Sequence, residues 1–433
     1  MAGRRRVAAS SAAAAAAAVA LLAGGLTGAQ GAAAEPLGRY VVVLDETARG
    51  RVDTIVAEHV RAHGLKAGFR YSHAVVGYAA VIPEGEVAAL RASPYVKAVA
   101  PDLPVRATAQ SLPTGVDRVQ ADVSGARAGD GSGAVDVGVA VIDTGIDTRH
   151  PDLDVAGGTN CVSPVPGASY RDNNGHGTHV AGTIGARDNG SDVVGIAPGA
   201  RLYSVKVLNS AGRGYTSNIV CGLDWVADNA ARLGIKVANM SLGGSGTDDG
   251  DCGLTDGDPQ HQAICRVVRQ AGVTMVAAAG NSTSDLAGFV PAAYDEVLTA
   301  TAMADFNGRP GGGAAATCYS DVDDTAADFS GFAVSAADAA HTIAGPGVCI
   351  TSTRLGGGTT VLSGTSMASP HVAGTAALCL AGPSCAGLTP AQVRAKLRGD
   401  AAAQPASYGF TGDPNHSPVS GRFYGHLVHA GGY

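Results

Sequence analysis

Residues 135–147 read VDVGVAVIDTGID, an apolar run that ends in an acidic residue and a glycine turn. The density of Val, Ile and Ala in 135–142 is typical of a strand that is buried on both faces. Similar runs recur at 202–208, 235–242, 273–280 and 296–303, with helical patterns at 217–234 and 261–272 among them. This alternation predicts an α/β fold with a mainly parallel sheet and helices on both faces.

Four polar residues stand at the ends of these predicted elements. Asp143 directly follows the first strand, and Asn281 follows the strand at 273–280. His176 lies in DNNGHGTHVAGTIGA, before an apparent helix, and Ser366 lies in GTSMASPHVAG, at another helix start. Each residue alone has an ordinary explanation as a turn former, a structural histidine or a helix cap. Because the working groups of such sheets gather at the carboxyl ends of the strands, we expect the four to meet.

Together these four residue types supply one chemistry. A serine hydroxyl is a poor nucleophile at neutral pH, so it needs an imidazole to accept its proton and a carboxylate to orient that imidazole. The oxyanion that forms on attack needs a hydrogen-bond donor, and a side-chain amide can be that donor. The residues also occur in the chain order Asp, His, Ser, which is known from one class of serine protease.

Five segments of the chain resemble the signature blocks of the subtilisin-like serine proteases, the subtilases. They are VIDTGID, NGHGTHVAGTI, NMSLGG, AAGN and GTSMASPHVAG, and they occur in the order of that family. The resemblance implies a subtilisin-like fold and a serine endopeptidase. It also implies that Asp143, His176 and Ser366 form the catalytic triad, and that Asn281 and the main-chain N–H of Ser366 bind the oxyanion.

The resemblance extends to the binding of polypeptide substrates. SLGG at 241–244 resembles one wall of the primary specificity pocket, which implies roles for Ser241, Leu242 and Gly243. GRG at 212–214 resembles the opposite edge, with Gly212 and Gly214. An extended peptide would bind both edges through its backbone, and we expect the missing Cβ atoms of the glycines to let it approach closely.

The helix that follows Ser366 has residues with simpler explanations. We expect Pro370 to lie in the first helical turn, where its missing N–H costs little. Thr365 and Ser369 read as local hydrogen-bonding groups, and His371 reads as a structural side chain because its position relative to Ser366 does not suit a base.

Residues 39–105 form a small unit of their own. Strand patterns at 39–46, 69–82 and 96–101 and helical patterns at 54–64 and 84–93 predict a ferredoxin-like α/β fold. The unit resembles the inhibitory propeptides of subtilases, which implies a role as an intramolecular inhibitor; a permanent accessory domain is the alternative. We predict a linker at 104–115, a cut between Val105 and Ser111, and domains at 35–107 and 108–433.

The N-terminus reads as a targeting segment. Arg4, Arg5 and Arg6 precede an Ala/Val/Leu run, and the small residues at 32–34 suit a cleavage site. Residues 1–34 therefore read as a secretory signal peptide, which predicts a secreted, extracellular protein; a membrane anchor is the alternative, but alanine is weak for spanning lipid.

Bulk composition narrows the partners. With 433 residues and 45% hydrophobic content, the chain can build a sizeable core over two or three domains. The net charge of −7 is made up of +3 in 1–34, 0 in 35–105 and therefore −10 in 106–433. The negative charge of residues 106–433 argues against nucleic acid or an anionic membrane as a partner. We also expect a monomer.

The eight cysteines all lie at or beyond Cys161, and their even number suits disulfides in an oxidising compartment. Pairing by proximity in sequence would give Cys161–Cys221, Cys252–Cys265, Cys318–Cys349 and Cys379–Cys385. A zinc site is the alternative, but the paired CxxC spacing typical of such sites does not occur in the sequence.

Metal ligands are harder to assign. We expect no cofactor for catalysis. Structural calcium is an open possibility, because many subtilases use it, but AAHTIA before 345–347 lacks an acidic residue that relatives often carry there. A cation could bind in the loop that contains Asp321, Asp323, Asp324 and Asp328, and also at DDGDC in 248–252. The favoured interpretation of both is a solvated acidic loop, since the EF-hand spacing does not occur.

Two other functions remain open. A metallohydrolase could use His176, His179 and Asp143 as ligands, but the HExxH pattern is missing and Ser366 and Asn281 would have no role. A binding protein that keeps the fold without catalysis is the second alternative, and it would normally have lost a member of the triad.

Overall fold

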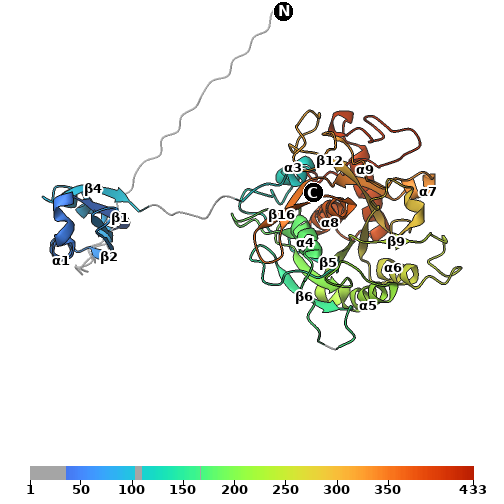
Figure 1. The fold of residues 1–433 in the computed structure, drawn as a ribbon, viewed down its shortest axis with the longest axis horizontal. Helices are drawn as coiled ribbons and strands as arrows, with labels where there is room; N and C mark the ends of the chain where they lie inside the picture. The colour runs from blue at the N-terminus through green and yellow to red at the C-terminus, as the bar shows by residue number, and fades with distance from the viewer. Residues whose placement is uncertain (1–35, 103–109, 166) are drawn as a thin grey trace, which may run out of the picture. The chain divides into compact units, whose positions relative to one another are not determined.

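The computed structural model describes residues 36–102, 110–165 and 167–433. The chain divides into two compact units, Met1–Val105 and Arg106–Tyr433 (Figure 1). The predicted signal peptide and most of the predicted cleavage region lie outside the described residues. Among the described residues, the helices are too short or too polar to cross a membrane.

The first unit has the predicted ferredoxin-like order of elements. They are β1 (Leu37–Leu44), α1 (Val52–His63), β2 (Lys66–Tyr71), β3 (Gly77–Pro83), α2 (Val87–Arg91) and β4 (Val96–Pro101). The sheet runs β2-β3-β1-β4, and all its neighbours pair antiparallel. The predicted extended chain at 69–82 is thus two strands with a turn between them. The core of the first unit contains Val42, Ile55, Tyr78 and Leu90, all fully buried or nearly so.

The second unit is built on an eight-stranded sheet of order β13-β12-β10-β8-β5-β7-β6, with β14 also paired to β12. Its strands are β5 (Gly138–Asp143), β6 (Val155–Asn160), β7 (Arg201–Lys206), β8 (Ile235–Met240), β10 (Thr274–Ala278), β12 (Leu298–Ala304), β13 (Thr325–Ala326) and β14 (Thr342–Pro346). All neighbours pair parallel except β12 with β13. The mainly parallel sheet predicted from 135–142 is confirmed.

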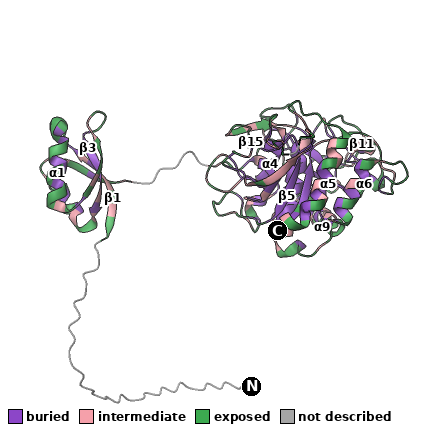
Figure 2. Cartoon of the chain, turned by 90° about the horizontal axis from the view of Figure 1, so that it is seen from below, coloured by how far each residue is buried: buried purple, intermediate pink, exposed green. Residues whose placement is uncertain are grey.

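Alternate side chains of β5 enter two different cores. Val139 and Val141 belong to the cluster that contains α4 (His176–Gly185) and α8 (Thr365–Ala381). Ala140 and Ile142 belong to the cluster that contains α5 (Thr216–Leu233) and α6 (Pro259–Arg269). Because successive side chains of a strand point to opposite faces, helices must cover both faces of the sheet, and Figure 2 shows the buried strands between helices with exposed outer surfaces.

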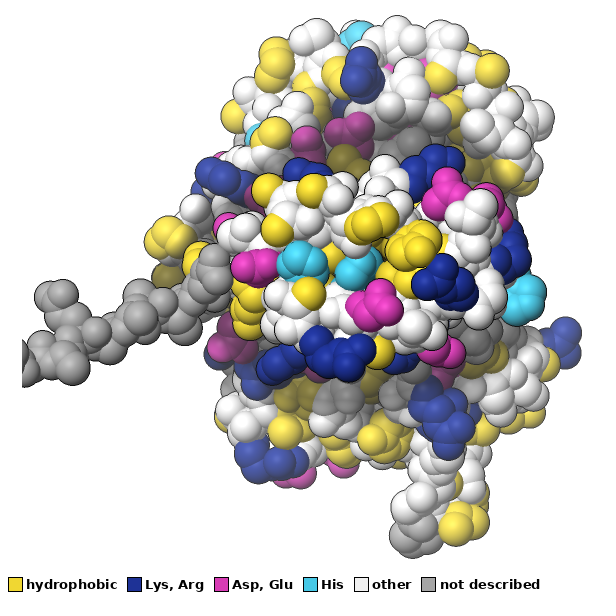
Figure 3. All heavy atoms as spheres, turned by 90° about the vertical axis from the view of Figure 1, so that its left-hand side faces the viewer, with side chains coloured by type: hydrophobic (Ala, Val, Ile, Leu, Met, Phe, Trp, Pro, Cys, Tyr) yellow, Lys and Arg dark blue, Asp and Glu magenta, His cyan; other side chains and the backbone are white. Residues whose placement is uncertain are grey.

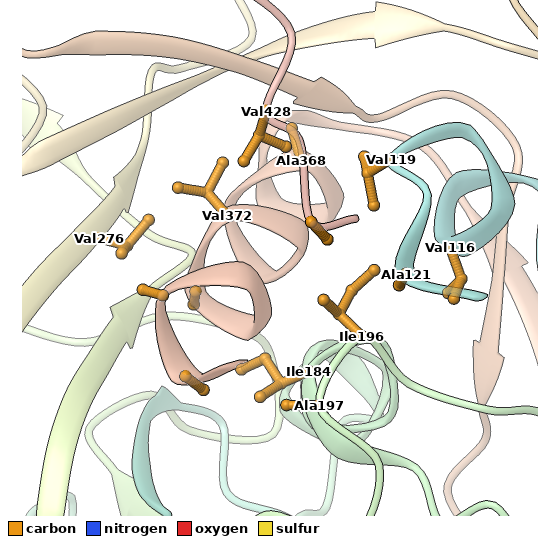
Figure 4. Packing of buried hydrophobic residues seen from close by; sticks show 14 of the residues in the cluster. Val116, Val119, Ala121, Ile184, Ile196, Ala197, Val276, Ala368, Val372 and Val428 are labelled. Carbon is orange, nitrogen blue, oxygen red and sulfur yellow. The ribbon is translucent and has the colours of Figure 1, made fainter. Parts of the chain in front are cut away.

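Helix α8 runs through the larger core. Figure 4 shows Ala368 and Val372 of this helix among Val119, Ile196 and Val276, which come from three other parts of the chain. All five residues have at most 1% of their surface exposed. The helix is therefore held on every side, which fixes the position of its first residues.

The second unit also contains several short strands and further α-helices, and short 3-10 helices occur in both units. The remaining strands and helices are β9 (Gly244–Ser245), β11 (Phe289–Val290), β15 (Ile350–Thr353), β16 (Thr359–Leu362), α3 (Thr114–Arg118), α7 (Ala336–Ala339) and α9 (Pro390–Ala402). The 3-10 helices of the chain are η1 (Glu46–Arg51), η2 (Glu84–Glu86), η3 (Ala121–Val123), η4 (Leu286–Gly288), η5 (Pro383–Cys385) and η6 (Ala406–Tyr408).

The four cysteine pairs expected from proximity in sequence are confirmed as disulfides: Cys161–Cys221, Cys252–Cys265, Cys318–Cys349 and Cys379–Cys385. On the surface of the first unit that faces the viewer in Figure 3, basic and acidic side chains are interspersed among uncharged ones.

The end of the predicted linker was wrong. Main-chain N–H of Ser111 donates to the carbonyl of Asp192 at 3.0 Å, and Nε2 of Gln110 donates to the carbonyl of Val193 at 2.6 Å. Helix α3 then begins at Thr114. Residues 110–115 are part of the second unit, because its main-chain groups supply their hydrogen-bond partners.

The interpretation of 321–328 as a solvated acidic loop was also wrong for Asp321, Asp323 and Asp324, each at most 9% exposed. The guanidinium of Arg118 is fully buried and donates to Asp324 at 2.9 Å. Asp323 accepts from the main-chain N–H of Phe306 at 2.8 Å. Spacing along the loop could not reveal these partners, because Arg118 lies 206 positions away in sequence.

Candidate active site

The first pair of the predicted site is Asp143 and His176. Asp143 is the last residue of β5 and fully buried, and His176 is the first residue of α4. Nδ1 of His176 lies 2.8 Å from Oδ1 and 3.0 Å from Oδ2 of Asp143. Asp143 can therefore hold Nδ1 in the protonated tautomer, which leaves Nε2 as the basic nitrogen.

Asp172 fixes the start of α4, and this role was not predicted. Its carboxylate accepts from the main-chain N–H of Gly175 at 3.0 Å and of Thr178 at 3.0 Å, and from Oγ1 of Thr144 at 2.9 Å. A negative charge near the start of a helix is favoured by the helix dipole, so Asp172, three residues before the N-cap Gly175, could have been identified as a residue that stabilises the helix start. The hydrogen bond from Thr144, the residue after Asp143, depends on the tertiary fold.

Burial and the neighbouring carboxylates have opposite effects on the pKa of His176. Burial lowers the pKa of the imidazole, but the charge and hydrogen bond of Asp143, with a further contribution from the charge of Asp172, outweigh it. The pKa of His176 is therefore raised above its ordinary value of 6.5. A raised pKa makes the ring a better proton acceptor from an alcohol.

Ser366 is the second residue of α8 and is half-buried. Its Oγ donates to the main-chain carbonyl of Ser241 at 3.2 Å, and its own carbonyl accepts from Oγ of Ser241 at 2.8 Å. Among the described residues, no hydrogen bond joins Ser366 to His176. The structure thus brings Asp143 to His176, and it places Ser366 against the segment that holds Ser241.

Pro370 was wrongly expected in the first turn of the helix, because it is the sixth residue of α8. A helical residue at this position would donate its N–H to the carbonyl of Ser366, four residues earlier. Proline has no N–H, so that carbonyl remains available and accepts from Ser241 instead. The proline thereby opens the contact between α8 and Ser241.

Asn281 lies just beyond β10 and next to the start of α8. Its Oδ1 accepts two hydrogen bonds from Thr365, one from the main-chain N–H and one from Oγ1, both at 2.8 Å. Oγ1 of Thr365 in turn accepts from the main-chain N–H of Gly280 at 3.1 Å. Since the carbonyl end of the amide is fixed in this way, its Nδ2 end is oriented as a donor; Thr365 was predicted only as a local hydrogen-bonding group.

The space beside Gly364 lies between the two predicted oxyanion donors. A Cβ atom added to Gly364 would stand 3.4 Å from Nδ2 of Asn281 and 3.7 Å from the main-chain nitrogen of Ser366. The two nitrogens therefore flank one small space, and an oxyanion would have to bind between them to accept from both. The geometry also explains a glycine at 364, whose φ of 153° is one that other residues rarely adopt.

All five predicted substrate-binding residues lie around one cavity. The cavity has a volume of about 680 Å³, and its lining includes Gly212, Gly214, Ser241, Leu242 and Gly243 together with His176. Leu208, Tyr215 and Arg213 add an apolar side chain, an exposed aromatic ring and a positive charge. The cavity therefore adjoins the imidazole.

Two of the three glycines are required for a different reason from the one expected. A Cβ at Gly214 would lie 2.4 Å from the carbonyl oxygen of Val207, and a Cβ at Gly243 would lie 2.4 Å from the ring of Phe289. Both glycines make room for the protein itself. A Cβ at Gly212 would make only an ordinary contact, 3.8 Å from Nδ2 of Asn174, so the positive φ of 68° in its turn explains this glycine.

The other histidines near the site are structural. His371 is fully buried and its Nδ1 lies 2.8 Å from the carbonyl of Met367, as expected of a structural side chain. Nε2 of His179 lies 2.9 Å from the carbonyl of Ile350. Burial lowers the pKa of each ring to about 4. The clusters of potential metal ligands found among the described residues do not combine His176, His179 and Asp143, so this geometry gives no support to the metallohydrolase alternative.

Comparison with known families gives two matches. Residues 135–425 match the Subtilase family, and residues 39–108 match Peptidase inhibitor I9. The first match covers most of the second unit and contains all four predicted catalytic residues. The second covers the small first unit.

Individual relatives agree with these matches. Subtilisin E of Bacillus subtilis is 37% identical over 84% of this chain and 85% of its own length. An alkaline protease of Alkalihalobacillus alcalophilus is 40% identical over 68% of this chain, which spans 66% of that relative's length. A crystal structure of a cold adapted subtilisin-like serine proteinase superposes with a TM-score of 0.52 at 29% identity, over 73% of this chain and 97% of that one.

The strand-end site, the mainly parallel sheet and the two family matches therefore agree with one another, and the chain belongs to the subtilase family of serine endopeptidases, with an inhibitor I9 domain before its protease domain.

Proposed function

We propose that this protein is a secreted serine endopeptidase that is made as an inhibited precursor and acts through Ser366, His176 and Asp143. The observation that carries the proposal is the hydrogen bond from Nδ1 of His176 to the buried carboxylate of Asp143, at 2.8 Å. It orients the imidazole and supports its positive charge during proton transfer.

The first step is an attack by Ser366 on a peptide carbonyl. Oγ of Ser366 leaves the carbonyl of Ser241, gives its proton to Nε2 of His176, and forms a bond to the carbonyl carbon of the substrate. The carbonyl oxygen becomes an oxyanion, which accepts from Nδ2 of Asn281 and the main-chain N–H of Ser366. The oxyanion then collapses to a carbonyl and the C–N bond of the peptide breaks, while His176 gives the proton to the leaving amine, so that an acyl-enzyme remains.

The second step releases the acyl group. Water enters in place of the amine, His176 takes its proton, and the resulting hydroxide attacks the acyl carbon. Collapse of the second oxyanion breaks the bond to Oγ of Ser366, which regains its proton from His176. This scheme requires no cofactor.

The substrate is a polypeptide in an extended conformation. Segments 212–214 and 241–243 border the cavity beside His176, where their main-chain groups can pair with a peptide. The I9 match at 39–108 supports an inhibitory role for the first unit toward this same site. We propose that the mature protein is a monomer formed after removal of residues 1–34 and 35–107.

The deciding experiment replaces the nucleophile. Ser366→Ala should abolish hydrolysis of an unstructured protein substrate and should leave a precursor in which 35–107 is still joined to the protease domain, when expressed in a host without other proteases. Ser191→Ala is the control, because it makes the same substitution at an exposed serine outside the proposed site. Normal hydrolysis or normal processing by Ser366→Ala would contradict the proposal.

A mass measurement tests the boundaries. The mature N-terminus should lie between Val105 and Ser111, and Gln110 and Ser111 should stay attached to the protease domain if the cut precedes them. A mature chain that begins at residue 35 would show instead that the first unit is a permanent accessory domain. Sedimentation of the mature protein then tests whether it is a monomer.

A further inference from the structure

The loop 248–258, which we name the acidic loop, leads from β9 to α6. It contains Asp248, Asp249, Asp251, Asp256 and Asp258. The disulfide Cys252–Cys265 ties the loop to α6. The catalytic scheme uses none of these residues.

His261 of α6 lies under the acidic loop with only 1% of its side chain exposed. Its Nε2 lies 2.9 Å from Oε2 of Glu296. Its Nδ1 faces two carboxylates, at 3.3 Å from Oδ1 of Asp249 and 3.5 Å from Oδ1 of Asp248. Despite these short distances, Nδ1 has no hydrogen-bond partner of acceptable geometry among the described residues.

The positions of these three atoms suit a metal ion better than a hydrogen bond. Bonds of about 2.0–2.2 Å from zinc to nitrogen and oxygen place tetrahedral ligand atoms about 3.4 Å apart. The separations of 3.3 Å and 3.5 Å from Nδ1 agree with that value. The three ligand atoms also all lie within 4.8 Å of one another.

The opposite side of the ring supports the same interpretation. A histidine that binds metal commonly donates its second N–H to a carboxylate, which orients the ring and strengthens its basic nitrogen. Glu296 provides that carboxylate, and Arg269 holds Glu296 at 2.6 Å. The ring of Tyr294 stacks on His261 at 4.1 Å with an angle of 4° between the planes, which prevents the imidazole from turning.

The carboxylates are held in place as well. Oδ1 of Asp248 accepts from the main-chain N–H of Gly250 at 2.8 Å. Asp249 accepts from four main-chain N–H groups of the loop, at 2.9 to 3.3 Å. The ligand set is thus oriented before any ion binds, which reduces the ordering cost of binding.

We propose that Asp248, Asp249 and His261 bind a divalent cation of the zinc class, with water as the remaining ligand. One imidazole nitrogen and two carboxylate oxygens suit Zn²⁺, whereas Ca²⁺ takes six to eight oxygen ligands. The nearby sulfur atoms of Cys252 and Cys265 are not ligands, because they are joined to each other. The ion stabilises the acidic loop against α6 and Glu296.

A proton is the competing occupant of Nδ1. Burial lowers the pKa of His261, but Glu296, Asp248 and Asp249 outweigh this effect and the pKa is raised. An imidazolium between the same carboxylates would balance their charge without any metal. The two occupants differ in one measurable way: only the metal gives saturable binding that depends on Asp248.

The test is a titration of the full chain carrying Ser366→Ala, which prevents self-digestion, with ZnCl₂ in metal-free buffer followed by calorimetry. We expect one zinc ion for each chain at this site. Asp248→Asn should weaken its binding at least about tenfold, and Glu296→Gln should weaken it about 10- to 100-fold. Asp256→Asn removes the same charge from the same loop and should leave affinity within about twofold of the parent, since Asp256 does not face Nδ1.

A second readout identifies the ligands. Co²⁺ in the site should give visible absorption bands of a low-coordinate nitrogen and oxygen site, which Asp248→Asn should remove and Asp256→Asn should keep. Equal zinc affinity in the parent and Asp248→Asn, or no binding up to about 1 mM zinc, would overturn the proposal. Circular dichroism of each variant separates a lost site from a lost fold. None of these measurements depends on protease activity.

Discussion

Ser241 and Ser366, which lie 125 positions apart in sequence, exchange two hydrogen bonds, at 2.8 Å and 3.2 Å. Asn239 supports the pair, because its Nδ2 donates to Oγ of Ser241 at 2.9 Å while its Oδ1 accepts from Ser369 at 2.6 Å. The end of β8 and the start of α8 are thereby joined through side chains. This junction sets the position of the predicted nucleophile relative to one edge of the substrate cavity.

Ser241→Ala should reduce both stability and turnover. The carbonyl of Ser366 would lose its partner, and Pro370 cannot replace it, so we expect a loss of about 1–3 kcal/mol in the free energy of unfolding. We also expect kcat to fall more than KM rises, because the helix start would shift. Urea unfolding in the Ser366→Ala background and steady-state kinetics of the single variant measure the two effects. Unchanged kcat would show that the junction is not needed for catalysis.

Asp143→Asn should lower kcat by about 10⁴-fold with little change in KM, because an amide can hold His176 in the wrong tautomer. The substitution is nearly isosteric, so the fold should remain. Steady-state kinetics with a short peptide substrate measure the effect. A loss of less than about tenfold would mean that Asp143 does not act through the imidazole.

The pH dependence of activity should follow His176. The ring must be neutral to accept a proton, and its pKa is raised above 6.5, so the acidic limb of kcat/KM should have its midpoint above 6.5. Asp172→Asn removes a charge that raises this pKa, and the midpoint should therefore move to lower pH. An unmoved midpoint in that variant would contradict the assignment.

The raised pKa of His176 also makes the stability of the fold depend on pH, in the opposite direction from activity. Because His176 has a higher pKa in the folded chain, its contribution to stability is fully present below the pKa of the unfolded chain. It is lost as pH rises through the folded pKa. Unfolding measured in the Ser366→Ala background at several pH values, with and without His176→Gln, isolates this contribution.

Thr365→Val should impair catalysis without removing any predicted catalytic residue. The valine keeps the volume but loses the hydroxyl that links Asn281 to Gly280. The main-chain N–H of residue 365 would still donate to Oδ1 of Asn281, but the amide would be held by one hydrogen bond in place of two. We therefore expect a fall in kcat smaller than the loss of about 10² to 10³ for Asn281→Ala. Thr365→Ser keeps the hydroxyl and should restore most of kcat. Equal activities of the valine and serine variants would exclude this positioning role.

Arg118→Met should be strongly destabilising. The guanidinium is fully buried and binds Asp324 at 2.9 Å and the carbonyl of Tyr408 at 2.7 Å. Its removal leaves a buried carboxylate without its charge partner, for which we expect a loss of about 3–5 kcal/mol. Arg309→Met on the surface is the control and should change stability by at most about 0.5 kcal/mol. Similar unfolding free energies for the two variants would contradict the buried ion pair.

Short-range patterns were sufficient for the order of the main elements and for a proposal of the site residues. The apolar run at 135–142 predicted a buried strand because a parallel strand must be apolar on both faces, and β5 confirms it. Proximity along the chain gave the correct partner for Cys379, which lies 6 positions before Cys385, because a short loop favours closure. Asp143 and His176 were identified by their places at element ends, before any contact between them was visible.

Only the tertiary structure decided which polar and charged groups, far apart in sequence, lie in contact. Arg118 donates to Asp324, which lies 206 positions away. The carbonyl of Ser366 accepts from Ser241. The buried ring of His261 lies against Asp249, in a loop whose sequence by itself indicates a solvated segment. Local spacing reports the periodicity of one element, whereas burial, charge pairing and a free carbonyl opposite a proline depend on what packs against that element. For that reason the sequence determined the chemistry available to this protein, and the packing of its helices against the sheet decided how that chemistry is held.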